Sequence, residues 1–236
     1  MRTILSIFIA CCLAAAHFMA IAAPVQIGKK NIEIPTPQGY GRVPADMTEL
    51  LSLLDSFTPP NNQSLALFLS EQDLAVAMSG EVPDMTRRFV VQVPKVAIDF
   101  NFTQADFEVL KAKARADLER TMANIKPRVD GLMDQASSEL SGKLGSQVEV
   151  GLESLVPLPI HHETPNSLSM SVLSRYSVGI KDGESVTEVA AGTLNFIRVK
   201  NTMFMLLLYG SKDDLEWTRE QSKSWIQAVT AANMAP

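Results

Sequence analysis

The spacing of hydrophobic and polar positions along the chain predicts strands separated by helices. Asn31–Pro35 alternates, with Ile32 and Ile34 on one face, as a half-buried strand does. Leu65–Ser70 and Thr202–Tyr209 are apolar on both faces, so each needs cover on both sides of a sheet. Further strands are expected at Leu74–Met78, Arg87–Val93, Gln147–Leu158, Leu168–Val178 and Val186–Val199.

Short polar segments mark the turns and ends of these strands. Lys200-Asn201 separates two strand patterns, which predicts that Val186–Val199 and Thr202–Tyr209 pair as an antiparallel hairpin. Lys181–Glu184 contains Asp-Gly and predicts a second turn. Ala23–Lys30 precedes the first of these strands and is expected to be a loose lead-in.

Three segments have helical spacing. Asp46–Phe57 has Asp46 and Glu49 in the positions of a capping box. A helical middle covers about 103–144, and Pro127 must kink or end it. Asp213–Asn233 closes the chain, with Trp217, Ser224, Trp225, Ala228 and Ala232 on one side, which favours packing of both tryptophans in the core.

These elements predict an α+β fold, in which helices flank a mostly antiparallel sheet. No internal repeat and no long linker divides residues 23–236. We therefore expect one α+β domain over residues 23–236, interrupted by the helical middle at about 103–144.

The N-terminus has the pattern of a signal peptide over residues 1–22. Arg2 precedes an apolar run, and Ala20 and Ala22 stand at −3 and −1 of a cut before Ala23. Two alternatives remain: residues 4–22 have nearly the length of an uncleaved membrane anchor, and Cys11 or Cys12 could mark a lipoprotein, although the residues before them fit that motif badly.

Cleavage would change the chemistry that the chain can offer. Cys11 and Cys12 are the two cysteines, so the processed chain forms no disulfide and is held together by its core. Loss of Arg2 lowers Lys+Arg from 21 to 20 against 26 Asp+Glu, a net charge of −6. The longest later apolar run, Met203–Tyr209, suits a strand rather than a membrane span. We expect a bacterial periplasmic or secreted protein, or a membrane-anchored one if the leader is retained.

Composition narrows the function further. The chain has 236 residues, 46% of them hydrophobic and 20% charged, which excludes a disordered or collagen-like protein. Its net charge of −5 argues against a general nucleic-acid binder, which needs a basic surface. The sequence has no P-loop, no G-x-S-x-G and no G-x-G-x-x-G motif. We therefore expect no cofactor and no catalytic residue that can be named.

Three polar segments remain as candidate sites. His161, His162 and Glu163 are good ligands for Zn²⁺ or Cu²⁺, but adjacent residues of a strand point to opposite faces, and a solvated loop is the other interpretation. Arg87-Arg88 suits an anion site or a solvated sheet edge. Lys111–Arg120 mixes basic and acidic residues, which indicates an exposed helix face.

Two segments resemble the PsbP/Mog1/DcrB-like family. Ile32–Tyr40 has that family's opening of strand, proline, glycine and aromatic residue. Met203–Tyr209, followed by an acidic turn and the helix Asp213–Asn233, is similar to the way the family closes. The resemblance implies an antiparallel sheet flanked by helices in a non-catalytic accessory or binding protein, and it carries over no site residues.

These observations predict an exported soluble envelope protein, a non-catalytic binding or accessory protein with a protein or small-molecule partner. No nucleic-acid partner is expected, and no membrane span after cleavage. The alternative is a metal-binding protein or metal-dependent hydrolase centred on His161, His162 and Glu163.

Overall fold

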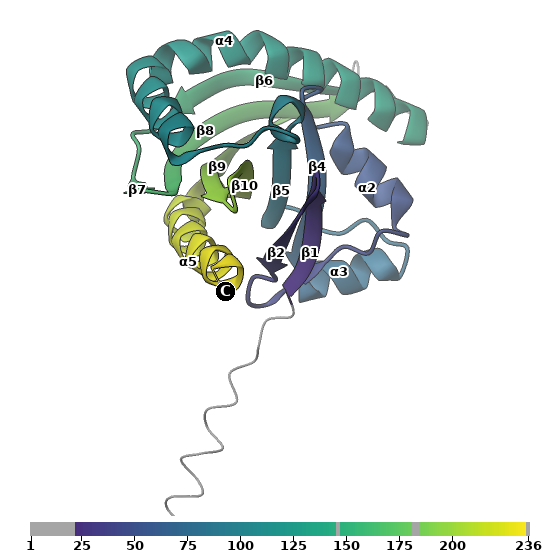
Figure 1. The fold of residues 1–236 in the computed structure, drawn as a ribbon. Coiled ribbons are helices and arrows are strands. Elements are labelled where there is room, and N and C mark those ends of the chain that lie inside the picture. Colours follow the sequence, from purple (N-terminus) through teal and green to yellow (C-terminus); the bar gives the residue numbers. More distant parts are fainter. Residues whose placement is uncertain (1–21, 145–146, 181–184, 235–236) are drawn as a thin grey trace, which may run out of the picture.

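The central feature of the fold is an eight-stranded antiparallel sheet (Figure 1). The structure is a computed structural model and describes residues 22–144, 147–180 and 185–234. Seven strands follow the order β3-β4-β5-β10-β9-β8-β6, and β7 pairs with β8. The strands are β3 (Tyr40–Arg42), β4 (Asn62–Ser70), β5 (Arg88–Pro94), β6 (Val148–Pro157), β7 (His162–Thr164), β8 (Ser167–Ile180), β9 (Ser185–Val199) and β10 (Thr202–Ser211).

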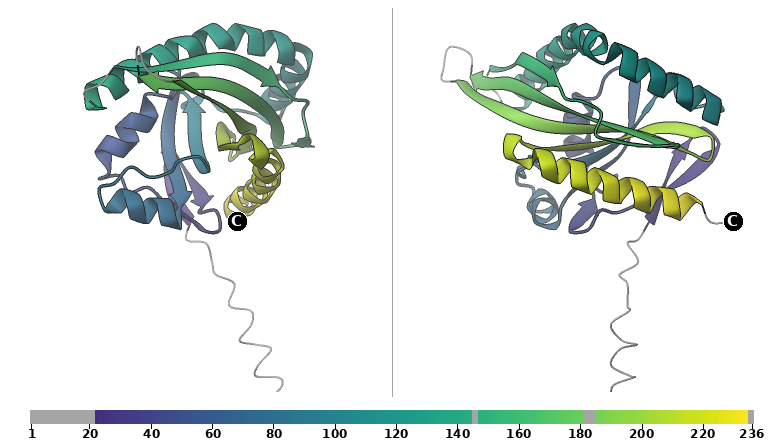
Figure 2. Two further views of the ribbon diagram at one scale, coloured as in Figure 1. Left: turned by 180° about the vertical axis from the view of Figure 1, so that it is seen from behind. Right: turned by 90° about the vertical axis from the view of Figure 1, so that its left-hand side faces the viewer.

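Helices and a separate hairpin cover this sheet. The hairpin consists of β1 (Ala22–Ile27) and β2 (Lys30–Pro35). The helices are α2 (Thr48–Asp55), α3 (Glu71–Met78), α4 (Gln104–Leu144) and α5 (Leu215–Asn233), with short 3₁₀ turns η1 (Lys95–Ala97) and η2 (Lys212–Asp214). Figure 2 shows α4 and α5 on opposite faces of the part of the sheet that β6, β8 and β9 form. The α+β fold with a mostly antiparallel sheet is thus confirmed.

Strand β10 lies inside the sheet and is covered on both faces, as its two-sided apolar pattern predicts. On one face, Phe89 and Phe204 pack with Trp225 of α5 and with the β1–β2 hairpin. On the other face, Leu67 and Leu207 pack with α2 and with the side chains around it. The core therefore has two layers, one on each side of the sheet.

The predicted β9–β10 hairpin is confirmed. Val199 pairs with Thr202 across the turn. Lys200 and Asn201 occupy its two central positions with φ of 49° and 54°, which is the backbone of a type I′ turn. That turn matches the right-handed twist of the strands, so the two-residue connection fixes the hairpin register.

Reciprocal side-chain hydrogen bonds cap the start of the helical middle. The Asp106 carboxylate accepts hydrogen bonds from the Thr103 amide (2.9 Å) and hydroxyl (2.6 Å), and the Asp106 amide donates to the Thr103 hydroxyl (3.2 Å). α4 continues past Pro127, so of the two expected effects of this proline, a kink or an end of the helix, the end is wrong.

Three local expectations are wrong. Leu74–Met78 is part of helix α3, because Ser70 caps it by accepting a hydrogen bond from the Asp73 amide (3.0 Å). The expected lead-in forms strand β1, which pairs with β2 across a Gly28-Lys29 turn and buries Val25 and Ile27. The first turn of α2 begins at Thr48 with Met47 at the N-cap, so Asp46 makes no side-chain cap.

Some sequence features lie outside the described residues. They are the expected signal peptide up to residue 21, which includes Cys11 and Cys12, and the expected turn Lys181–Glu184. Within the described ranges, none of the helices combines enough length with enough apolarity to cross a bilayer.

Candidate functional site

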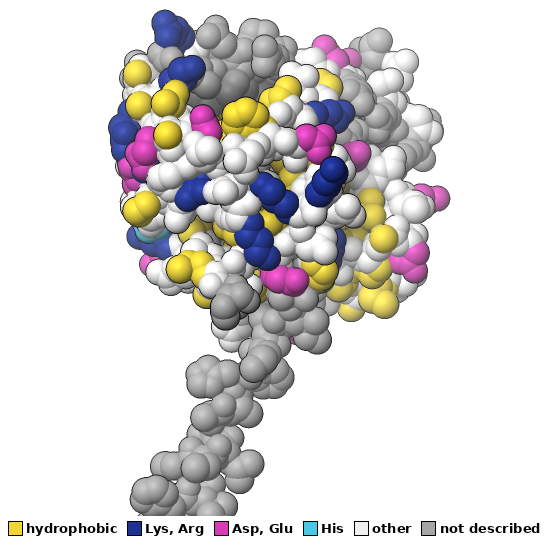
Figure 3. Space-filling model, viewed as in Figure 1, with side chains coloured by type: hydrophobic (Ala, Val, Ile, Leu, Met, Phe, Trp, Pro, Cys, Tyr) yellow, Lys and Arg dark blue, Asp and Glu magenta, His cyan; other side chains and the backbone are white. Residues whose placement is uncertain are grey.

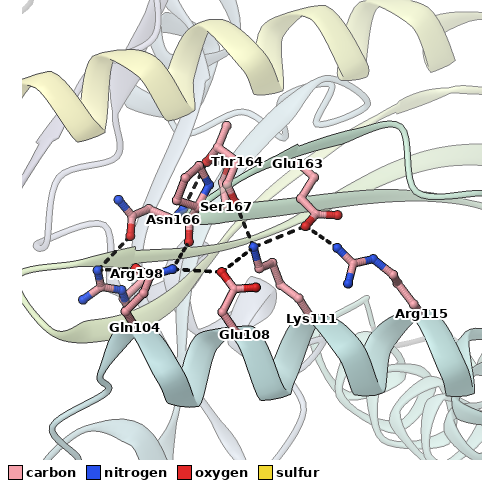
Figure 4. Close-up of polar contacts among 10 residues, drawn as sticks. Gln104, Glu108, Lys111, Arg115, Glu163, Thr164, Asn166, Ser167 and Arg198 are labelled. Carbon is pink, nitrogen blue, oxygen red and sulfur yellow. Dashed lines mark hydrogen bonds and ion pairs between the residues drawn. The ribbon is translucent and has the colours of Figure 1, made fainter.

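Glu163, the predicted metal ligand on β7, is paired with two cations of α4 (Figure 4). Lys111 Nζ lies 3.2 Å from a Glu163 carboxylate oxygen, and Arg115 donates a hydrogen bond to the same oxygen. The Arg115 hydrogen bond is the main reason why the pKa of Glu163 falls below its usual value. The carboxylate therefore serves as an anchor for α4.

Further polar contacts around Lys111 and Arg198 hold the start of α4 against the segment between β7 and β8. Lys111 Nζ also contacts Glu108 (2.8 Å) and donates to the Thr164 carbonyl (3.2 Å). Arg198 of β9 donates to the side-chain oxygens of Gln104 (2.6 Å) and Asn166 (2.8 Å). Figure 4 shows these side chains between α4 and the strands. Because Lys111 is buried, this cluster differs from the exposed basic helix face that its sequence pattern favours.

His161 and His162 are directed toward the other side of this edge. The His161 amide donates to the Ser169 carbonyl (3.1 Å), which holds the histidine beside β8. The charges that act on the His161 ring are mainly Arg219 and Lys223 of α5, and Lys223 also acts on His162. The two histidines thus lie near cations of α5, whereas Glu163 contacts α4.

This arrangement bears on the metal hypothesis. Within the part of the chain that the structure describes, no three His, Cys, Asp or Glu side chains come close enough together to hold a metal ion. His161, His162 and Glu163 together stay a prediction, which metal analysis of the purified protein tests. The structure brings the two histidines together but gives Glu163 another role.

The His161 ring makes stability depend on pH. Its two nitrogens are shielded from solvent and have no hydrogen-bond partner in the described structure. Burial, helped by the nearby cations, lowers the pKa of His161 from 6.5 to about 4. The unfolded chain therefore takes up a proton at a higher pH than the folded chain does, and protonation of His161 favours unfolding. The contribution of the neutral His161 ring to the free energy of unfolding is fully present above pH 6.5 and is lost as the pH falls through about 4.

Replacing His161 by Gln should flatten that pH dependence. The full pKa shift corresponds to roughly 3 kcal/mol, and because the side chain is only half-buried we expect about 1–2 kcal/mol after solvent screening. Urea unfolding of wild type and variant across this pH range measures the difference. His162→Gln serves as the neighbouring control, and a wild-type pH profile in the His161→Gln variant would contradict the prediction.

A concavity lies beneath α2, and we call it the α2 cleft. It has a volume of about 510 Å³ and opens between α2 and the sheet face of β4, β5 and β10. Val43, Leu51, Leu54, Leu67 and Val90 supply much of its apolar lining. No residue of α2 is fully buried, so the helix covers the sheet without filling the space beneath it.

Arg88 brings a positive charge into the α2 cleft. It lies opposite Tyr209 in the sheet, with its guanidinium 4.3 Å from the centre of the Tyr209 ring. One nitrogen donates to the Met85 carbonyl (2.7 Å). Burial lowers the pKa of Arg88, and the described residues give it no carboxylate partner. A guanidinium in this position remains able to bind a bidentate anion.

Arg87 directly precedes β5, and its side chain lies on the opposite face of the sheet from that of Arg88. It forms an ion pair with Asp214 and stacks 4.9 Å from the Trp217 ring. The arginine pair is therefore split, with one member holding α5 and the other lining the α2 cleft. The sequence singles out this pair, but only the fold shows which arginine is left for a ligand.

A second polar group lies on β5 within the α2 cleft. The Gln92 side-chain nitrogen donates to the Thr58 hydroxyl (3.2 Å), and the Gln92 side-chain oxygen accepts from the side-chain amide of Asn62 (3.2 Å). These bonds hold its side chain in place. Asp55 is the carboxylate of the lining, and it is exposed on the last turn of α2. The cleft thus combines apolar walls with a few fixed polar groups, as small-molecule sites do.

Comparisons with known proteins give a limited result. No protein family and no curated protein matches the sequence. The solution structure of cyanobacterial PsbP (CyanoP) from Synechocystis sp. PCC 6803 is similar at 11% identity and a TM-score of 0.34, covering 93% of this chain and 94% of that one. The crystal structure of the Saccharomyces cerevisiae Ran-binding protein Mog1p is similar at 11% identity and a TM-score of 0.29, covering 90% and 92%. The weak resemblance to PsbP and Mog1 is thereby confirmed, and no activity follows from it.

Proposed function

We propose that the protein is a non-catalytic accessory protein that binds an elongated apolar molecule ending in a carboxylate. The ligand would lie in the α2 cleft with its carboxylate on Arg88. The observation that carries this proposal is the Arg88 guanidinium, which lines an apolar cleft and has no carboxylate partner among the described residues.

Physical chemistry supports both parts of such a ligand. A volume of about 510 Å³ lies within the range of ordinary ligand pockets. Burying the apolar chain stabilises the complex by about 25 cal/mol per Å². A charged group taken out of water without a partner is costly, so a ligand carboxylate would offset the desolvation of Arg88. The planar guanidinium also matches the two oxygens of a carboxylate.

The chemistry of the lining favours binding over catalysis. The residues that line the α2 cleft include hydroxyl groups at Ser52, Thr58 and Ser64, but no histidine, lysine or cysteine. A hydroxyl becomes a nucleophile only with an adjacent base that is itself oriented. The lining supplies no such imidazole or amine.

The export of this protein is part of the proposal. The expected cut before Ala23 falls one residue after the start of β1 at Ala22, so processing there would leave β1 almost whole. The product would be a soluble bacterial protein of the periplasm or the medium. N-terminal sequencing tests this, since a chain that begins at Met1 would indicate an anchored form instead.

Dodecanoate should bind the protein and raise its melting temperature, whereas dodecyltrimethylammonium should not. The two probes share their alkyl chain and differ in the charge of the head group. Replacing Arg88 by Gln should weaken dodecanoate binding about 10-fold to 100-fold, the range for losing hydrogen bonds to a charged group. Isothermal titration calorimetry measures this.

The matched control is Arg87→Gln. It removes the same charge from the adjacent residue, whose side chain lies on the other face of the sheet with Asp214. Dodecanoate affinity should survive in that variant. Equal losses in the two variants, or equal binding of the anionic and cationic probes, would contradict the proposed site.

A further inference from the structure

Five cationic side chains gather where three turns meet, and we call this surface the basic face. Its members are Lys29, Lys30, Lys95, Arg198 and Lys200. Lys29 lies in the β1–β2 turn and Lys30 begins β2, Lys95 begins η1, Arg198 lies near the end of β9, and Lys200 lies in the β9–β10 turn. Figure 3 shows Lys and Arg side chains grouped at the centre of the face turned to the viewer.

Close backbone contacts hold these turns together. Lys30 Nζ donates to the Asn201 carbonyl (2.8 Å), and Lys200 Nζ donates to the Asn31 carbonyl (3.1 Å). The Phe102 amide donates to the Asn201 carbonyl (2.9 Å). Gly28 has φ of 58°, and a Cβ there would lie only 2.6 Å from the Ile98 carbonyl oxygen. The folded chain therefore holds the turns that carry the basic face in fixed positions.

Its charges are not neutralised by carboxylates. Lys30, Lys95 and Lys200 bond to backbone carbonyls, and Arg198 bonds to side-chain amide oxygens. Among the described residues, no ion pair involves a member of the basic face. Asp99 is the acidic residue nearest to the β1–β2 turn. Because the whole chain carries −5, this concentration of positive charge is a local departure from its acidic balance.

Apolar side chains project beside these cations. Val96 is 89% exposed and directly follows Lys95. Phe100 is 50% exposed, with its ring 5.6 Å from that of Phe102. Exposed apolar residues next to lysines are typical of surfaces that rest on lipid head groups.

We propose that the basic face docks the protein on an anionic lipid bilayer. The lysines would lie at the level of the head groups, and Val96 and Phe100 would enter the head-group region. Nucleic acid fits less well, because a net acidic chain is repelled by a polyanion at a distance and duplex binders need more extensive basic surfaces. This proposal is independent of the α2 cleft, because none of the five cations lines it.

Co-sedimentation with vesicles tests the docking. The full-length and the processed protein should both bind vesicles of phosphatidylglycerol mixed with phosphatidylcholine, and the processed protein, which lacks the apolar leader, should not bind vesicles of phosphatidylcholine alone. Added salt should release them, because the attraction is electrostatic. The double variant Lys29→Glu/Lys95→Glu should lose about tenfold or more in vesicle affinity.

Two control variants separate local charge from net charge. Lys113→Glu/Lys212→Glu changes the net charge equally at two exposed lysines outside the basic face and should keep wild-type vesicle affinity. Phe100→Ser should weaken binding several-fold without changing its salt dependence, and wild-type melting temperatures show that each variant is folded. Equal losses in the two double variants, binding to both lipid mixtures alike, or binding of DNA in place of vesicles would overturn the proposal.

Discussion

Replacing Trp225 by Ala should lower the free energy of unfolding by about 3–5 kcal/mol, the cost of deleting a large buried aromatic side chain. Trp225 is 3% exposed, and its ring lies edge-on to Phe68 and Phe89 at 5.7 and 5.1 Å. Such pairs add stability beyond the buried area itself. The side chain also joins α5 to the face of β4 and β5.

The indole nitrogen adds a second contribution. Its N–H donates to the Pro35 carbonyl over 2.8 Å in a buried position, which ties α5 to the end of β2. Trp225→Phe keeps much of the ring and removes this donor, so it leaves a buried carbonyl unpaired. We expect that variant to lose about 1–3 kcal/mol. Urea unfolding of both variants separates the packing contribution from the hydrogen bond.

Trp217→Ala is the control on the same helix. Trp217 is only partly buried, and Arg87 stacks on its ring from outside. Less area is lost there and the surrounding side chains can close over it, so we expect about half the cost of Trp225→Ala. Equal effects of the two substitutions would show that the core is not centred where Trp225 meets Phe89.

The strands were the most predictable part of this fold. Thr202–Tyr209 is apolar on both faces, and β10 is covered on both faces as that pattern requires. The two-residue connection Lys200-Asn201 predicts the β9–β10 hairpin, because few backbone conformations can join two strands so tightly. These features depend on residues that are close in the sequence.

The errors have two sources, one local and one tertiary. Leu74–Met78 has no strong periodicity, and the Ser70 cap makes it a helix. Val25 and Ile27 look like part of a loose lead-in until β2 provides a partner strand and the core encloses them. The Ser70 cap joins residues three positions apart and could have been recognised in the sequence, whereas the burial of Val25 and Ile27 depends on the rest of the fold.

In the candidate site too, some features could be predicted from the sequence and others depend on the fold. Strand alternation is enough to predict that Arg87 and Arg88 point to opposite faces. That Asp214 pairs with Arg87 depends on a residue 127 positions away. That Arg88 faces an open cleft depends on α2 and β4, which are also distant in the sequence. The predicted metal site at His161, His162 and Glu163 stays a prediction, but nothing in the sequence indicates that Glu163 contacts α4 while the charges acting on His161 come from α5.

Lys111→Ala should destabilise the protein by about 3 kcal/mol, the lower end of the range for breaking a buried ion pair. The Lys111 side chain is 4% exposed and contacts Glu108, Glu163 and the Thr164 carbonyl. The lower end is expected because both carboxylates keep contact with solvent or another cation. Glu108 is 52% exposed, and Glu163 retains Arg115.

Two further substitutions show whether charge or volume is responsible. Lys111→Met keeps the buried stem and removes only the ammonium group, so it should recover part of the loss. Lys113→Ala removes an exposed lysine two positions along α4 and should change stability by less than about 0.5 kcal/mol. If Lys111→Ala and Lys113→Ala proved equally mild in urea unfolding, Lys111 would not anchor α4. The exposed helix face that the sequence pattern suggests would then describe both lysines, and the contacts with β7 would add nothing to stability.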